Sequence, residues 1–339
     1  MMRHSIKSTL FMGAILFGLS MCLTSCEDIL GEWDKPTPTN VTPSGGDDDD
    51  GGGSTPATIP GLLAGKFSVS DTKQVQFSQG NLQATYDGSS WTWAFATNQW
   101  DYVGNAVGNT KVTATAPFIS ENGTVDLFGW VGESSTVLTS DPAKYGISQS
   151  YSDSHYGTKK GTEGETLKSD WGTLTISNGG NTPNYGWRTL TSAEWTYLFI
   201  DRSGATVKST ANVRCTMATI NTDATAVKGM ILFPDGKEFA DAEATWGTLN
   251  NKSDYTTQCT SAQWTALADK GCVFLPAAGR RDGMLVQGDD SNGRYWSSSP
   301  DAAGAGYAYY VLFRSDELGP AGYSNRYFGH SVRLVRDAE

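Results

Sequence analysis

The side chains that most often carry chemistry, thiols and imidazoles, are few and widely separated in this sequence. The chain holds five cysteines and three histidines. Cys215, Cys259 and Cys272 form no C-x-x-C pair, and His155 and His330 lie far apart, so their spacing does not suit a zinc site. We therefore expect no metal site and no cofactor, buried thiols with at most one disulfide, and histidines that are either exposed or hydrogen-bonded.

Serines and carboxylates near the C-terminus form no catalytic pattern either. The serines at 297–299 lack the G-x-S-x-G sequence that exposes a nucleophile. Asp282, Asp289 and Asp290 lie in glycine-rich segments, where solvated carboxylates are usual. The segment 288–293, "GDDSNG", offers oxygen ligands for calcium but lacks the acidic residue that closes an EF-hand loop, so it predicts a turn. We expect no enzymatic activity.

Tyrosine and small residues are concentrated in residues 301–330, which contain five Ala, five Gly and five Tyr. Antibody paratopes use the same mixture, because Tyr gives a large contact area at low entropic cost. In "AYYVLFRS" the side chains of Tyr310, Leu312 and Arg314 share one face of a predicted strand. Because arginine is seldom buried, we assign this face to the outside. An ordinary amphipathic strand is the alternative interpretation.

Short strands and two short helices are predicted to position these residues. Thr191 precedes Glu194, and Thr260 precedes Gln263, at the spacing of a capping box that begins a helix. Gly271 suits the left-handed cap after the second helix. The chain has 39 Gly and 11 Trp, with many turn signals. We expect an α+β fold of short antiparallel strands, two short helices and long loops around one continuous core.

The N-terminus resembles a bacterial lipoprotein signal. A basic start, an apolar stretch too short to span a bilayer and "LTSC" predict a signal peptide at 1–25 and lipid attachment at Cys26. Residues 26–60 are rich in Pro, Gly, Ser, Thr and Asp and predict a disordered tether before a domain at 61–339. The acidic residues after Cys26 are similar to export tags of some Gram-negative surface lipoproteins. We expect an outer-membrane lipoprotein that is exposed on the cell surface and touches the membrane through its lipid only.

The charge of the chain argues against one class of partner. The formal net charge is −11, and basic residues do not cluster beyond pairs. Binding to phosphates requires clustered Lys and Arg, so we exclude nucleic acid as a partner.

Four segments resemble the C-type-lectin-like fold in the form found in formylglycine-generating-enzyme-like proteins. They are "ISNGGNTPNYGWRTLTSAEWTYLF", "VKGMILFPDG", "GCVFLPAAGRRDGMLVQGDDSNGRYWSSS" and "SVRLV". The resemblance covers about residues 62–336. The catalytic branch of that group relies on a pair of cysteines near the C-terminus, and no cysteine follows "YWSSS" here. The resemblance therefore implies the fold without the enzymatic activity.

Residues 300–330 are similar to the variable region of proteins diversified by retroelements, in which a reverse transcriptase rewrites template adenines and leaves the scaffold unchanged. Asn codons in such a template cannot give Trp, Met, Lys or Gln, and residues 301–330 contain none of these. Glu317 departs from the pattern, because an Asn codon cannot become Glu. The resemblance implies a variable display region framed by the fixed segments "YWSSS" and "SVRLV".

We therefore expect a surface-displayed protein that binds a protein or glycan ligand through a diversified site. The alternatives are an invariant glycan- or matrix-binding adhesin on the same fold, and a structural component of a surface assembly. The four tyrosines of the site are expected to carry most of the binding energy. The expected binding residues are Asp301, Ala302, Ala303, Gly304, Ala305, Gly306, Tyr307, Tyr310, Leu312, Arg314, Asp316, Gly319, Ala321, Gly322, Tyr323, Ser324, Tyr327, Phe328 and His330.

Overall fold

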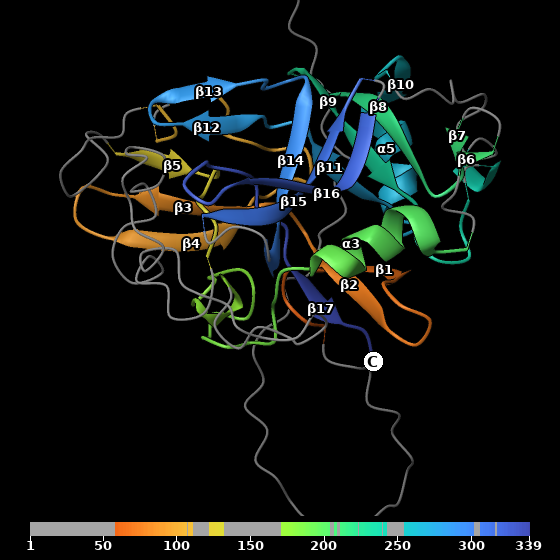
Figure 1. Cartoon of the computed structure of the whole chain (residues 1–339), viewed down its shortest axis with the longest axis horizontal. Helices are drawn as coiled ribbons and strands as arrows, with labels where there is room; N and C mark the ends of the chain where they lie inside the picture. The colour runs from red at the N-terminus through yellow and green to blue at the C-terminus, as the bar shows by residue number, and fades with distance from the viewer. Residues whose placement is uncertain are drawn as a thin grey trace, which may run out of the picture. The chain divides into compact units, whose positions relative to one another are not determined.

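Short strands make up most of the regular structure in the computed structural model (Figure 1). The signal peptide, Cys26, most of the tether and His155 lie outside the described residues, which all belong to one compact unit, Pro56–Glu339. Strands predominate over a few short helices, which confirms the α+β class. The structure describes residues 58–106, 108–110, 122–131, 171–203, 207–208, 211–222, 224–238, 240–242, 254–301, 306–315 and 317–339.

The display region forms most of an antiparallel sheet in the order β14-β15-β16. β15 is the middle strand, so its backbone is hydrogen-bonded on both edges. Trp296 of β14 lies opposite Tyr310, and Tyr309 lies opposite Tyr323 of β16. The pairing shifts once along each edge, and such bulges bend a strand. The strands are β14 (Asn292–Pro300), β15 (Tyr307–Arg314) and β16 (Glu317–Asn325).

A four-stranded sheet in the order β10-β8-β9-β11 lies on one side of the β14–β16 sheet, and the β3–β5 strands and the β12–β13 hairpin lie on the other (Figure 1). β10 and β8 are parallel, and the other neighbours in the four-stranded sheet are antiparallel. Its strands are β8 (Cys215–Asn221), β9 (Ala226–Leu232), β10 (Thr257–Thr260) and β11 (Val273–Pro276).

The remaining described strands form four small sheets. β17 pairs with β2, so the C-terminal strand closes onto the first hairpin of the unit. The sheets contain β1 (Leu62–Ser68), β2 (Gln74–Ser78) and β17 (Val335–Asp337); β3 (Leu82–Tyr86), β4 (Trp91–Phe95) and β5 (Gly123–Val125); β12 (Arg280–Asp282) and β13 (Leu285–Gln287); and β6 (Val207–Lys208) and β7 (Ala211–Asn212).

Both predicted capping boxes are present. The Thr191 hydroxyl accepts the backbone N–H of Glu194 at 3.1 Å, and the Glu194 carboxylate accepts the backbone N–H of Thr191 at 2.9 Å. Thr260 and Gln263 make the same reciprocal pair. Gly271 has φ +87°, which confirms the predicted left-handed residue after the second helix. The helical segments are a 3-10 turn at Trp171–Thr173, α3 (Ser192–Thr196), a π-turn η3 (Tyr197–Asp201) and α5 (Ser261–Ala268).

A buried ion pair joins the start of α3 to the C-terminal strand. The Arg188 guanidinium lies 2.7 Å from the carboxylates of both Glu194 and Asp337. Its side chain is only 5% exposed. Burial alone would raise the pKa of Glu194, but the hydrogen bond and positive charge of Arg188 outweigh it and lower that pKa. This contact fixes the helix start to β17.

The buried apolar side chains form three clusters rather than the single continuous core that we expected. β15 contributes to two of them. Tyr310 and Leu312 pack in the first cluster with Trp296, whereas Val311 and Phe313 pack in the second. Because successive side chains of a strand point to opposite faces, the β14–β16 sheet separates the two clusters.

The three cysteines of the described unit are free and buried, as predicted. Burial raises the pKa of each thiol to about 12, so each stays protonated and unreactive at neutral pH. They are Cys215, Cys259 and Cys272.

Candidate ligand-binding surface

The side chains of β15 alternate as predicted, but our assignment of an exposed face is wrong. Tyr310 and Leu312 are each only 8% exposed, and Val311 is fully buried on the opposite face. Of the three residues that we assigned to the exposed face, only Arg314, at the end of the strand, is exposed, and it pairs with Glu317 across the turn to β16. The expectation failed because the exposure of a terminal arginine does not extend along a central strand.

An exposed tyrosine pair marks the surface of this sheet. Tyr307 is 38% exposed and Tyr323 is 65% exposed. Their rings meet edge to face, with centroids 5.8 Å apart and an interplanar angle of 89°. This geometry is the favoured one for aromatic pairs, and it holds both rings at the surface. Neighbouring Ala321 is exposed and small, so it leaves the Tyr323 ring accessible.

A chain of polar contacts supports the backbone of β15 at and beside Tyr307. The Arg326 Nε donates a hydrogen bond to the Tyr307 carbonyl at 2.9 Å, and its guanidinium lies 4.5 Å from the centre of the Trp130 ring. Trp130 in turn donates to the Ser297 carbonyl at 2.9 Å. The Ser297 hydroxyl donates to the Tyr309 carbonyl at 2.9 Å. Ser297, in the "YWSSS" segment, therefore supports the backbone of β15 next to the tyrosine pair.

His330 lies beneath the surface, contrary to our expectation that it is exposed. It is fully buried and stacks on Trp296 at 4.1 Å, with Tyr310 at 4.8 Å. Neither ring nitrogen has a hydrogen-bond partner in the described part of the chain, so it is not the hydrogen-bonded histidine that we expected either. Burial, with smaller contributions from the charges of Arg294 and Arg280, lowers the pKa of His330 well below 6.5. Its imidazole is therefore neutral at physiological pH.

Two arginines that we did not predict flank this stack. The Arg280 guanidinium lies 4.4 Å from the centre of the Phe328 ring, and that of Arg294 lies 5.5 Å from the centre of the Tyr310 ring. Neither arginine pairs with a carboxylate among the described residues. Both lie before the display region in sequence. Arg294 is the cross-strand neighbour of Leu312, and Arg280 is adjacent to Arg281, which forms an isolated bridge with Gly329. A strand-pairing prediction could have found them.

The structure places the predicted binding residues in four groups. Tyr307, Arg314, Ala321 and Tyr323 are exposed. Asp301, Gly306, Gly319, Gly322, Tyr327 and Phe328 are half-buried. Tyr310, Leu312, Ser324 and His330 are buried, which corrects the expectation that they are exposed. Ala302, Ala303, Gly304, Ala305 and Asp316 lie outside the described residues.

Comparisons with known proteins do not assign this chain to a family. No protein-family model, curated protein or solved structure matches the chain.

Within the described ranges, no helix has the length and apolarity needed to cross a membrane. The same ranges contain no group of three or more His, Cys, Asp or Glu side chains suited to a metal ion.

Proposed function

We propose that this chain is a lipid-anchored protein of the bacterial surface that binds a protein or glycan ligand through the exposed side of its β15–β16 hairpin. Its fold is a C-type-lectin-like domain, supported by the segments that resemble that fold and by the mixed, strand-rich architecture. Cys26 carries the lipid, and the segment after it holds the domain away from the membrane.

The observation that carries the proposal is the exposed Tyr307–Tyr323 pair on a rigid frame. Burying an aromatic side chain away from water is favourable. Two aromatic side chains that stay exposed side by side therefore contribute little to the stability of the fold. Aromatic side chains of this kind dominate the binding energy of interfaces. Because hydrogen bonds fix the backbone of Tyr307, little conformational entropy is lost when a ligand binds.

We further propose that a retroelement diversifies this surface. The structure narrows the positions at which change is tolerated. Substitutions at the exposed Tyr307, Ala321 and Tyr323 leave the two clusters intact, whereas substitutions at the fully buried Val311 and Phe313 create cavities or overpacking.

Deep sequencing of the codons for residues 297–335 across a clonal population tests the diversification, together with the DNA just downstream. We expect substitutions that match adenines in a nearby template copy and that are enriched at positions 307, 321 and 323 over positions 308, 311 and 313. A uniform sequence without a template would overturn diversification and leave the invariant adhesin, whose ligand a glycan array would then seek.

The anchor is tested separately by metabolic labelling with a palmitate analogue in a Gram-negative host. The wild-type chain should incorporate the label and appear in the outer-membrane fraction, and Cys26→Ser should not be labelled. Cys22→Ser is the matched control, because it lies within the predicted signal peptide and should leave labelling unchanged. Equal labelling of wild type and Cys26→Ser would refute the anchor.

A further inference from the structure

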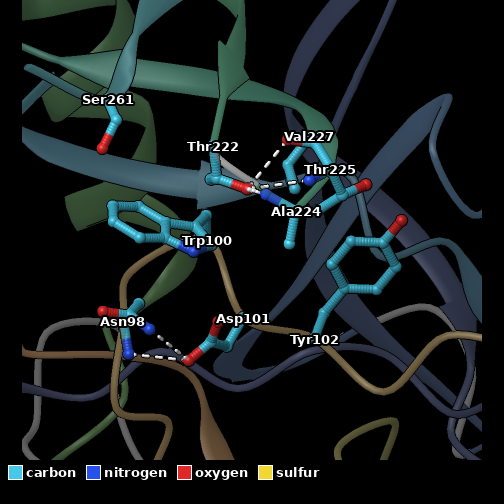
Figure 2. Close-up of a pocket in the computed structure, with 9 residues that line it drawn as sticks. All are labelled: Asn98, Trp100, Asp101, Tyr102, Thr222, Ala224, Thr225, Val227 and Ser261. Atoms are coloured by element: carbon cyan, nitrogen blue, oxygen red, sulfur yellow. Dashed lines mark hydrogen bonds between the residues drawn. The ribbon is translucent and has the colours of Figure 1, made fainter. Parts of the chain in front are cut away.

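A surface cavity of about 450 Å³, open to solvent, lies between the segment after β4, the β8–β9 turn with the start of β9, and the first residue of α5 (Figure 2). None of its lining residues belongs to the display region. Its volume is within the range of small-molecule sites. It is therefore a separate candidate site, with side chains that a diversified surface would not alter.

The segment after β4 is held rigidly. Asn98 donates to one carboxylate oxygen of Asp101 through its backbone N–H at 2.8 Å and its side-chain amide at 3.0 Å. Gln99, between them, is buried and accepts hydrogen bonds from the Phe274 backbone at 2.8 Å and from Arg333 at 3.1 Å. These contacts point Gln99 inward and leave Trp100 and Asp101 along the cavity (Figure 2).

Hydrogen bonds also support the opposite side of the cavity. The Thr222 hydroxyl accepts the backbone N–H of Thr225 at 3.0 Å and donates to the Thr225 carbonyl at 2.9 Å, so one side chain closes the β8–β9 turn. Ser261 is the first residue of α5 and directly follows its N-cap, Thr260. The cavity is thus bounded by hydrogen-bonded segments from three parts of the fold.

Several polar groups along the cavity form no hydrogen bond with any described residue. They are the indole N–H of Trp100, the second carboxylate oxygen of Asp101, the hydroxyl of Tyr102 and the hydroxyl of Ser261. Burial, then the charges of Asp290, Asp289 and Asp126, raise the pKa of Tyr102 to about 12, so this hydroxyl keeps its proton and can donate. The cavity therefore offers donors and acceptors together.

The side chains that line the cavity indicate which class of ligand it can bind. Trp100 and Tyr102 supply apolar ring surface, and the carboxylate and hydroxyl groups supply hydrogen bonds. The lining residues include no Lys, Arg or His, and Asp101 would repel an anion. A sugar ring combines an apolar C–H face with a rim of hydroxyls, which matches this arrangement. We propose that the cavity binds a neutral saccharide unit, packed against Trp100 and hydrogen-bonded to Asp101.

Ligand-observed NMR with the purified full chain tests this site. The probes are the methyl glycosides of glucose, mannose and galactose, and N-acetylglucosamine, each at about 10 mM because single sugar units bind weakly. We expect saturation transfer to at least one probe, and about tenfold weaker binding in Trp100→Leu, which loses the aromatic surface. Tyr102→Phe keeps its ring and loses only the hydroxyl. It tests the cavity even if Trp100→Leu fails to fold, and it should weaken binding less.

Ile200→Ala is the control, because Ile200 is exposed on η3 and belongs neither to the cavity lining nor to the display region. It should bind the probes as the wild type does. Tyr323→Ala alters the exposed tyrosine pair and tests whether the probes bind the β15–β16 surface instead. Absence of saturation transfer with all four probes would overturn the proposal, and so would unchanged binding in Trp100→Leu. Loss of binding in Tyr323→Ala alone would also overturn it and place the sugar on the β15–β16 surface instead. This test does not depend on diversification, so the two proposals can fail separately.

Discussion

The buried imidazole of His330 makes the stability of the unit depend on pH. In the folded state its pKa lies well below 6.5, chiefly because the ring is fully buried. In the unfolded state the ring returns to its ordinary value, so unfolding takes up a proton whenever the pH lies between the two pKa values. The contribution of His330 to the free energy of unfolding is therefore fully present above about pH 6.5 and is lost as the pH falls.

The size of the effect follows from the proton uptake. One proton bound on unfolding changes the free energy of unfolding by about 1.4 kcal/mol per pH unit below the unfolded pKa. Lowering the pH from about 7.5 to about 5.5 should therefore cost about 1.4 kcal/mol through His330. Asp126 acts in the opposite direction, since burial raises its pKa to about 6 and acid therefore favours the folded state.

The assay is urea unfolding of wild type and His330→Phe at both pH values. Phe retains a ring to stack on Trp296 and cannot titrate. The Asp126 effect is common to both proteins and cancels in the difference, so the variant should lose about 1.4 kcal/mol less than wild type on acidification. Tyr323→Phe is the matched control and should follow the wild type. Equal losses in wild type and His330→Phe would refute a neutral, buried His330.

Three further predictions concern the scaffold. Arg188→Met should destabilise the unit by about 2 kcal/mol in denaturant unfolding, because Glu194 and the half-exposed Asp337 lose their buried partner and keep Lys73, at 3.3 Å from each; a loss below about 0.5 kcal/mol would contradict this. Gly271→Ala should cost more than Gly236→Ala: both have positive φ, but a Cβ at 271 would lie 2.7 Å from the Gly65 Cα, whereas one at 236 meets nothing within 4 Å. Equal losses in these two variants would show that the close approach is unimportant. The three buried cysteines should react with a thiol reagent only after unfolding, and rapid reaction of the native chain would contradict their burial.

Local signals in the sequence predicted local structure well. The Thr191 and Thr260 capping boxes and the left-handed Gly271 depend on residues close in the chain, so their spacing was sufficient. The exposure of β15 was wrong because it depends on which elements cover each face, and strand alternation alone does not show that.

The cavity beside Trp100 could not be predicted for the same reason. It joins three segments that are far apart in sequence, and nothing in any one of them indicates a site. Arg280 and Arg294 were missed because they reach the display region only through strand pairing. Information on pairing, rather than on composition, would have been needed.

The burial of β15 on both faces has a practical consequence for protein engineering. A combinatorial library that randomised all of residues 301–330 would spend most of its clones on sequences with a disrupted interior, because the middle of this strand belongs to two clusters. A library confined to positions 307, 321 and 323 should retain the soluble yield of the parent. The hairpin could then serve as a scaffold whose recognition properties are selected without a second round of stabilisation.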